Sequence, residues 1–244
     1  MKTIAIMQPY LFPHFAYFQL FQAADVFVFY DDVQYIRRGW INRNRILLHG
    51  EPHYIIFPIC RCPRNTTIAD CIFSNGIVRA KKKILMTLHH AYSKAPYFKT
   101  VFHTLKDIID YDETNVALFV EHTIRSILDL LGKEVMLHRS SELDVDKSLL
   151  GQDRLIAIVK ALGGQTYVNP IGGIDLYCFQ DFTNNGIELR FLKETTEAYK
   201  QFTDEFTPSL SIIDVMMFNS IEETKKRLNQ FKLIDKDSGK SHWT

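Results

Sequence analysis

Several features that would assign the chain to a common class of protein are missing from its sequence. No apolar run approaches the roughly 20 residues that a membrane-spanning helix needs, so we expect no transmembrane segment. The first residues lead into a strand instead of the apolar core of a secretory signal, and we expect a cytoplasmic protein. The four cysteines, at 60, 62, 71 and 178, lack the spacing of zinc ligands. We expect reduced thiols and no metal site.

An excess of one charge is also missing, because 29 lysines and arginines stand against 28 aspartates and glutamates. The net charge of +1 does not favour a long basic surface, and no specific nucleic-acid partner is expected. Neither a Walker loop nor a complete GxGxxG motif occurs, so the sequence names no cofactor. The sequence does not determine the oligomeric state, and a homo-oligomer is one of the states that it allows.

Apolar segments of strand length alternate with segments of helical periodicity. This alternation predicts an α/β fold, a parallel sheet with helices on both faces. We expect strands at 3–7, 26–30, 135–137, 166–168 and 187–191, and helices near 14–24, 77–91, 97–109, 114–131, 152–162, 174–183, 209–219 and 221–231. After a polar loop at 31–45, a hairpin is expected through 46–49 and 54–57, with its turn at 50–52.

The helices at 77–131 are too long for one crossover between strands. We expect them to form a helical insertion in a single domain, 1–232, followed by a polar tail at 233–244.

The first candidate site is the loop between the first strand and the first helix. Gln8 ends the strand, and a buried amide there needs partners or a ligand. His14 and Tyr17 are three apart and share the first turn of the helix, whose free N–H groups attract anions. Tyr10 lies in the same loop. The alternative interpretation is that the aromatic residues of this segment are core residues.

The same corner resembles, in part, the histidine-x-glycine-histidine signature of nucleotidyltransferases and class I aminoacyl-tRNA synthetases. His14 matches, whereas Ala16 replaces the glycine and Tyr17 replaces the second histidine. The resemblance implies a Rossmann-like, nucleotidyltransferase-like sheet.

The second candidate site follows the second strand. Asp31 and Asp32 could act as a base or accept hydroxyl groups, and neighbours in a strand point to opposite faces, so one of them is expected to face the site. Four arginines within nine residues could bind phosphates or a sugar acid, and Trp40 could stack on a sugar or base. The alternative is a solvated loop whose arginines pair with its own aspartates. The other substrate-binding candidates here are Gln34, Tyr35, Asn42, Arg43 and Asn44.

Two further segments are candidates. Gly172 and Gly173 stand between a strand and an expected helix, where glycine lets an anion approach the backbone; many such turns hold no ligand. Near the C-terminus, Ser209 or Ser211 is expected to cap a helix that carries Asp214.

Several of these segments together resemble the WbqC-like protein family. They are Ile6–Phe18, Asp31–Tyr35, Gly39–Asn44, the helix that contains Arg154, Tyr167 with Gly172–Gly173, and Pro208–Asp214. The family is similar to bacterial proteins encoded among genes for surface polysaccharide, notably O-antigen, and a glycine or aminoacyl transferase role has been suggested for it.

The resemblance implies a transferase that acts on an activated sugar or glycan precursor, by acyl or aminoacyl transfer. Its partner would be a small molecule, a nucleotide-sugar or an acyl or aminoacyl donor. In this hypothesis Asp31 or Asp32 is the base, and His14 with Gly172 and Gly173 holds phosphate or carboxylate. One alternative is an ATP-dependent ligase that adenylates a carboxylate; another is a non-catalytic scaffold of the glycan assembly pathway.

Overall fold

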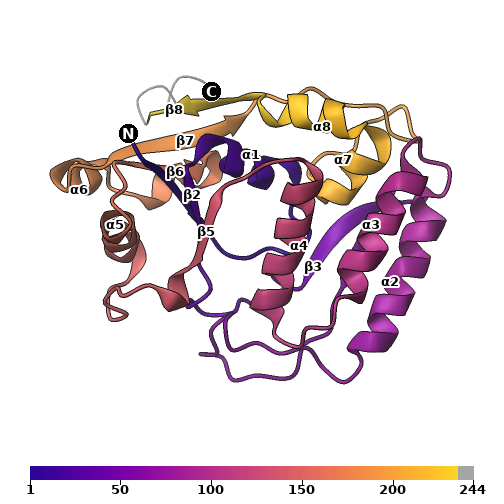
Figure 1. Cartoon of the computed structure of the whole chain (residues 1–244), viewed down its shortest axis with the longest axis horizontal. Coiled ribbons are helices and arrows are strands. Elements are labelled where there is room, and N and C mark those ends of the chain that lie inside the picture. Colours follow the sequence, from indigo (N-terminus) through magenta and orange to yellow (C-terminus); the bar gives the residue numbers. More distant parts are fainter. Residues whose placement is uncertain (236–244) are drawn as a thin grey trace.

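The chain folds around one six-stranded sheet, as a computed structural model shows for residues 1–235, the part of the chain that the structure describes (Figure 1). A two-stranded sheet lies apart from it. The strands of the large sheet are β1 (Thr3–Met7), β2 (Val26–Phe29), β5 (Met136–Arg139), β6 (Thr166–Pro170), β7 (Glu188–Glu194) and β8 (Phe231–Ile234). The small sheet is the hairpin of β3 (Arg43–Leu48) and β4 (Glu51–Ile56).

The strand order is β5-β2-β1-β6-β7-β8, and all neighbours are parallel except β7 and β8. The chain proceeds outward from β1 through β2 to β5 and then returns to the other side of β1 with β6. The order therefore reverses between β1 and β6. In open α/β sheets, ligands bind beyond the carboxyl ends of the strands near such a reversal.

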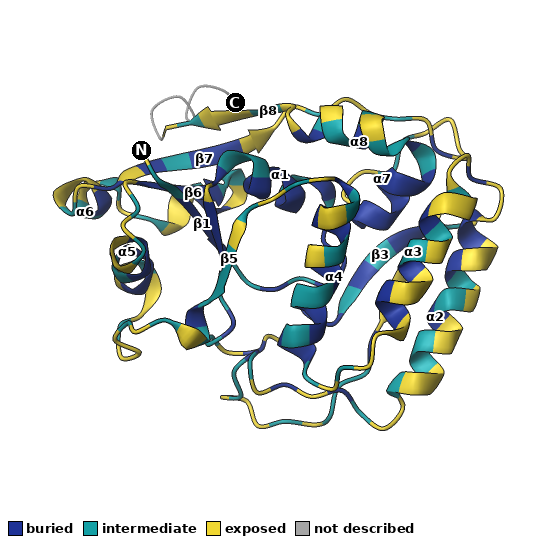
Figure 2. Ribbon diagram, viewed as in Figure 1, coloured by how far each residue is buried: buried dark blue, intermediate teal, exposed yellow. Residues whose placement is uncertain are grey.

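Helices cover both faces of the large sheet, because its strands contribute apolar side chains to two separate buried clusters. Figure 2 shows the buried residues of the central strands in dark blue. On one face, α5 (Gly151–Ala161) and α6 (Phe179–Asn184) contribute Val159 and Phe182 to a cluster with Ile4. On the other face, α1 (Phe15–Ala23), α7 (Ile212–Phe218) and α8 (Ile221–Leu228) pack over Ala5 and Phe27. Successive β1 residues point alternately into the two clusters, which is the period of two expected of a strand.

The connection from β2 to β5 contains the hairpin and three amphipathic helices, α2 (Ile77–Tyr92), α3 (Phe98–Asp110) and α4 (Val116–Leu130). These helices stand together at one side of the molecule (Figure 1). Their buried faces join the same apolar cluster as α1. α4 ends at Leu130. Gly132, just beyond its end, has a φ of 60° that suits glycine, and the Lys133 N–H donates to the Leu128 carbonyl at 2.9 Å.

Some expected boundaries are wrong. The helix expected near 174–183 is a 3₁₀ helix at Ile171–Leu176 followed by α6 from Phe179. The helix expected to reach 231 ends at Leu228, and β8 begins at Phe231 because it pairs with β7. The helix expected from 209 begins at Ile212. The hairpin starts at Arg43 and turns at residues 49–50, so β4 already begins at Glu51. Of the polar tail expected at 233–244, residues 236–244 lie outside the described residues.

Candidate functional site

The two adjacent carboxylates after β2 have different surroundings. Asp31 is 1% exposed, and its carboxylate accepts hydrogen bonds from the Ser141 N–H at 2.9 Å and the Ser141 hydroxyl at 2.8 Å. The Ser140 hydroxyl lies 3.1 Å from Asp31 Oδ1 and also bonds Asp32. Asp31 thus connects the end of β2 to the segment after β5, and both of its carboxylate oxygens already accept hydrogen bonds. Asp32 is the carboxylate that faces a cavity.

The cavity next to Asp32, here called the Asp32 cavity, has a volume of about 540 Å³. It lies beyond the carboxyl ends of β2 and β5, where the start of α5 approaches them. Arg154 is 3% exposed, forms an ion pair with Asp32 and donates to the Asp146 carbonyl at 2.6 Å. The polar and charged lining residues are Tyr30, Asp32, Gln34, Thr67, Asp70, Ser141, Lys147 and Arg154.

Tyr30 connects this cavity to the strand-order reversal, since its N–H donates to the Met7 carbonyl at the end of β1 at 2.8 Å. Burial raises the pKa of the Tyr30 hydroxyl, and the nearby Asp32 carboxylate raises it further. The hydroxyl therefore stays protonated at neutral pH and can donate to a ligand. The cavity combines two carboxylates, Asp32 and Asp70, the Tyr30 hydroxyl as a donor, and two cationic side chains, Lys147 and the Asp32-paired Arg154.

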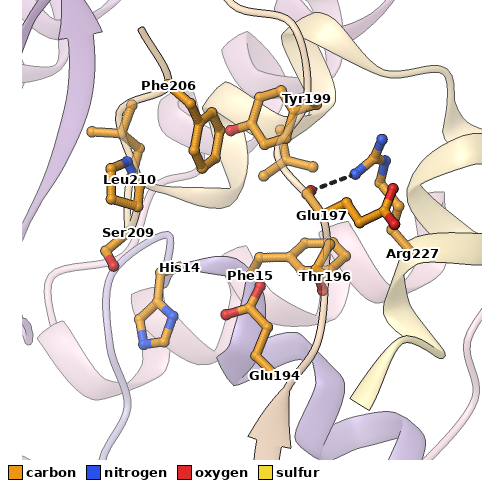
Figure 3. A pocket seen from close by; sticks show the side chains of 12 residues that line it. His14, Phe15, Glu194, Thr196, Glu197, Tyr199, Phe206, Ser209, Leu210 and Arg227 are labelled. Carbon is orange, nitrogen blue, oxygen red and sulfur yellow. Dashed lines mark hydrogen bonds between the residues drawn. The ribbon is translucent and has the colours of Figure 1, made fainter.

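His14 lies elsewhere. It is the residue before α1, it forms an isolated β-bridge with Ser211, and it lines a second cavity of about 160 Å³, here called the His14 cavity (Figure 3). Burial lowers the pKa of its imidazole, and the charge of Arg45 lowers it further. His14 and Asp32 line different cavities, so the structure does not bring these two predicted catalytic residues together.

The other predicted residues of the first loop hold the loop itself. Tyr17 is 1% exposed and its hydroxyl donates to the Gln8 carbonyl at 2.9 Å. The Tyr10 and Tyr17 rings are 5.7 Å apart. The alternative interpretation of Tyr17 as a core residue thus fits its burial. The Gln8 side chain is half-buried and has no hydrogen bond to a residue within 1–235, which leaves it free for a ligand.

Tyr35, Asn42 and Asn44 contribute to the packing of the hairpin. The Asn42 side chain accepts from the Tyr35 hydroxyl at 3.0 Å and donates to the Phe57 carbonyl at 2.8 Å. Asn44 donates to the carbonyls of Leu11 and Phe12, both at 2.9 Å. Phe12 has a φ of 41°, a strained value for a large side chain. The hydrogen bonds of the buried Asn44 amide therefore satisfy its own donors and also hold the first loop in an unfavourable backbone conformation.

Trp40 and Arg43 lie on the surface of the hairpin and not in the Asp32 cavity. The Trp40 and Tyr54 rings stack with centroids 6.2 Å apart, and the Arg43 and Arg45 guanidinium groups lie 4.5 Å and 5.6 Å from the Tyr54 and Trp40 ring centroids. Arg43 also donates to the Gly39 carbonyl at 3.1 Å. Substrate binding by Trp40 and Arg43 stays a prediction, and it would take place at a separate surface.

The Gly172–Gly173 pair does not start an α-helix, because it lies within the 3₁₀ helix and α6 begins only at Phe179. The α-helix expected directly after this pair is therefore wrong, whereas anion binding by Gly172 and Gly173 stays a prediction. A Cβ on Gly173 would lie 2.1 Å from Asn169 Nδ2, whereas a Cβ on Gly172 would meet no atom within 4 Å. Gly173 is required for close packing against Asn169.

These two glycines provide a matched pair of variants. We expect Gly173→Ala to lower the free energy of unfolding by about 1–3 kcal/mol, the usual cost of overpacking. Gly172→Ala, with open space around the new methyl group, should leave the free energy of unfolding nearly unchanged. Urea unfolding followed by circular dichroism measures both. Equal losses in the two variants would contradict the packing role of Gly173.

Important polar residues were not found from the sequence. Ser140 and Ser141 carried no signal, since isolated serines after a strand are common in turns. Lys147 was not singled out, and Arg154 was noted only as part of a helix. A second buried network was also missed: Asp214, which is fully buried, accepts from the hydroxyls of Tyr92 and Tyr199 and the amide of Gln201.

The comparison with protein families finds one match, which covers most of the chain. The WbqC-like protein family matches residues 8–226. This chain belongs to that family. It is similar to the uncharacterized protein Rv1507c of Mycobacterium tuberculosis (strain ATCC 25618 / H37Rv), with 27% identity over 227 residues, which cover 90% of this chain and 94% of that protein. No solved structure matches the chain.

The match to the WbqC-like family runs from Gln8 to Lys226, so it covers every lining residue of the Asp32 cavity and all those of the His14 cavity except Arg227. Among the described residues, no helix is both long and apolar enough to cross a membrane.

Proposed function

We propose that this WbqC-like protein is a transferase that acts on an activated sugar or glycan precursor for surface polysaccharide, and that the Asp32 cavity is its site. The observation that carries the proposal is the position of Asp32. Its carboxylate faces a cavity of about 540 Å³ at the carboxyl ends of the strands, beside a hydroxyl donor and two cations. A donor with a phosphate or carboxylate and an acceptor with hydroxyl or amine groups need this combination.

Five of the lining residues have a role in the proposal. Asp32 accepts the proton of the sugar hydroxyl or amine as its oxygen or nitrogen bonds to the acyl or aminoacyl carbonyl carbon. The bond from that carbon to the rest of the donor breaks, and the leaving group departs with the electron pair of that bond and takes up a proton. Arg154 holds the Asp32 carboxylate in place, and Lys147 binds the anionic part of the donor. Tyr30 and Gln34 donate hydrogen bonds that orient the sugar. Gln8, at the end of β1, lies beside the strand-order reversal and adds a further amide to this side of the sheet.

The fold supports the same proposal. With the strands renumbered by their order along the chain, the five parallel strands have the order 3-2-1-4-5, which is that of dinucleotide-binding Rossmann folds. Such sheets bind nucleotide-containing ligands beyond their carboxyl ends. A nucleotide-linked sugar is therefore the first donor or acceptor to test.

Titration calorimetry with a panel of nucleotide sugars, on the wild type and on two variants, tests the assignment. We expect Asp32→Asn and Lys147→Ala each to weaken binding by roughly ten-fold or more, because each removes a charged hydrogen-bonding partner. The matched control is Asp107→Asn, an exposed aspartate whose neighbour in α3 is His103. Affinities unchanged in both cavity variants would exclude this cavity as the site.

The same preparations separate the alternatives. ATP–pyrophosphate exchange with a panel of amino acids would indicate a ligase that adenylates a carboxylate. Capture of glycan-assembly proteins with no turnover of any bound sugar would indicate a scaffold.

A further inference from the structure

The His14 cavity joins two segments that are far apart in the sequence and that the Asp32 cavity does not use. One is the first loop with the start of α1, and the other runs from the end of β7 to the segment before α7. The bridge between His14 and Ser211 and the bond from the Ser211 hydroxyl to the Phe12 carbonyl, at 2.8 Å, hold the two segments together. These contacts between the two segments hold the walls of the cavity in place.

Three aromatic side chains contribute to the walls of this cavity. Phe15, Tyr199 and Phe206 surround its centre, and the Tyr199 and Phe206 rings meet edge to face with centroids 5.0 Å apart (Figure 3). At about 160 Å³ it is close in size to an engineered apolar cavity of about 150 Å³ that holds benzene. The volume holds about six non-hydrogen atoms, so a larger molecule such as an amino sugar would place only its ammonium end inside the cavity.

The lining of the cavity carries two carboxylates, Glu194 and Glu197, and one cation, Arg227, while the charge of Arg45 acts on His14 from outside the lining. The Glu194 carboxylate points to the same end of the cavity as the His14 imidazole (Figure 3). None of the ion pairs within residues 1–235 involves Glu194. The one cation in the lining, Arg227, is neutralised by Glu223 at 3.1 Å, and it donates to the Glu197 carbonyl at 2.9 Å. Glu194 is thus a carboxylate without a cationic partner, beside aromatic rings.

The imidazole adds an acceptor and no charge. Burial lowers the pKa of His14, so the ring is neutral at pH 7 and can accept a hydrogen bond. Aromatic faces and carboxylates together are the surroundings in which proteins bind ammonium groups, because the ring quadrupole attracts a cation.

We propose that the His14 cavity binds a small organic ammonium ion, with its charged nitrogen between Glu194 and His14 and its apolar part against Phe15 and Phe206. The proposal is independent of the transferase assignment, which rests on the Asp32 cavity. The ammonium group can belong to a free alkylamine or to an amino sugar, and the probes below separate these sources.

Titration of ¹⁵N-labelled protein with n-butylamine, followed by amide shifts in NMR spectra at pH 7, tests the proposal. We expect saturable shifts confined to residues around the cavity, with Phe15 and Thr196 among them. Butan-1-ol and butyrate, which have the same apolar chain without the positive charge, should produce no such shifts. Saturation by glucosamine at lower concentration than by butylamine would assign the ammonium to an amino sugar, and the reverse order would assign it to a free amine.

Glu194→Gln should weaken butylamine binding by roughly ten-fold or more, because it removes the charge that bonds the ammonium group. Glu51→Gln, on the exposed surface of β4, should leave the affinity unchanged. The same spectra show whether each variant is folded. Three results would overturn the proposal: equal binding of butan-1-ol, shifts spread over surface carboxylates, or an unchanged affinity in Glu194→Gln.

Discussion

Arg154→Met is expected to lower the free energy of unfolding by about 3–5 kcal/mol, the usual loss when one partner of a buried ion pair is removed. The arginine is 3% exposed and its side chain bonds both Asp32 and the Asp146 carbonyl. Without it, the Asp32 carboxylate, only 12% exposed, would be left with a hydroxyl partner and no charge partner. Urea unfolding at pH 7 measures the loss.

The matched control is Arg125→Met. This arginine pairs with Glu121 at 2.7 Å on the surface of α4 and is 46% exposed, so its removal should cost less than about 1 kcal/mol. A double-mutant cycle with Asp32→Asn measures the coupling between Arg154 and Asp32 directly. A loss for Arg154→Met no larger than that for Arg125→Met would contradict the buried ion pair.

The second large effect is expected from Asp214→Ala, which should cost roughly 3 kcal/mol, because buried donors left without acceptors cost about 1–3 kcal/mol each and do not add fully. The carboxylate accepts from the Tyr92 hydroxyl at 2.8 Å, the Tyr199 hydroxyl at 2.6 Å and the Gln201 amide at 2.8 Å. Tyr92 in turn accepts from the Leu47 N–H of the hairpin. Asp214→Asn keeps one oxygen acceptor and should cost less.

Burial also raises the pKa of Asp214 in the folded protein above its ordinary value of 3.8. The folded state therefore holds this proton more tightly than the unfolded state does. The resulting stabilisation is full below pH 3.8 and is lost as the pH rises through the folded-state pKa. Chemical unfolding of the wild type and Asp214→Asn from pH 4 to 7 should show this step only in the wild type. A constant difference between the two proteins would contradict a raised pKa.

The alternation of apolar strands and periodic helices was sufficient to predict the parallel sheet, because buried strands and amphipathic helices have different periods. β8 was missed because Phe231–Ile234 is short and half-exposed, and it becomes a strand only by pairing with β7. The short 3₁₀ helix around Gly172–Gly173 was missed because glycines add no apolar periodicity to the sequence, and the close approach of Gly173 to Asn169 is seen only in the structure.

The order of the sequence placed the candidate residues after the correct strands, but it could not show which of them line the same cavity. Asp31 and Asp32 look alike in the sequence, and only Ser140, Ser141 and Arg154, more than 100 residues away, give them different surroundings. His14 was grouped with them because both follow neighbouring strands. The turn of the first loop toward Ser211 takes the imidazole to another cavity. Contacts of this range carry no signal in a single sequence.

The central place of β1 has a consequence for synthesis on the ribosome. One edge of β1 pairs with β2, which follows within the same short segment, whereas the other edge pairs with Thr166–Val168 of β6. A nascent chain thus carries β1 with one edge unpaired until most of the protein has been translated, and unpaired edges are prone to association with other chains. The completion of the sheet, and of the His14 cavity with its lining residues from Glu194 to Arg227, waits for the last third of the chain.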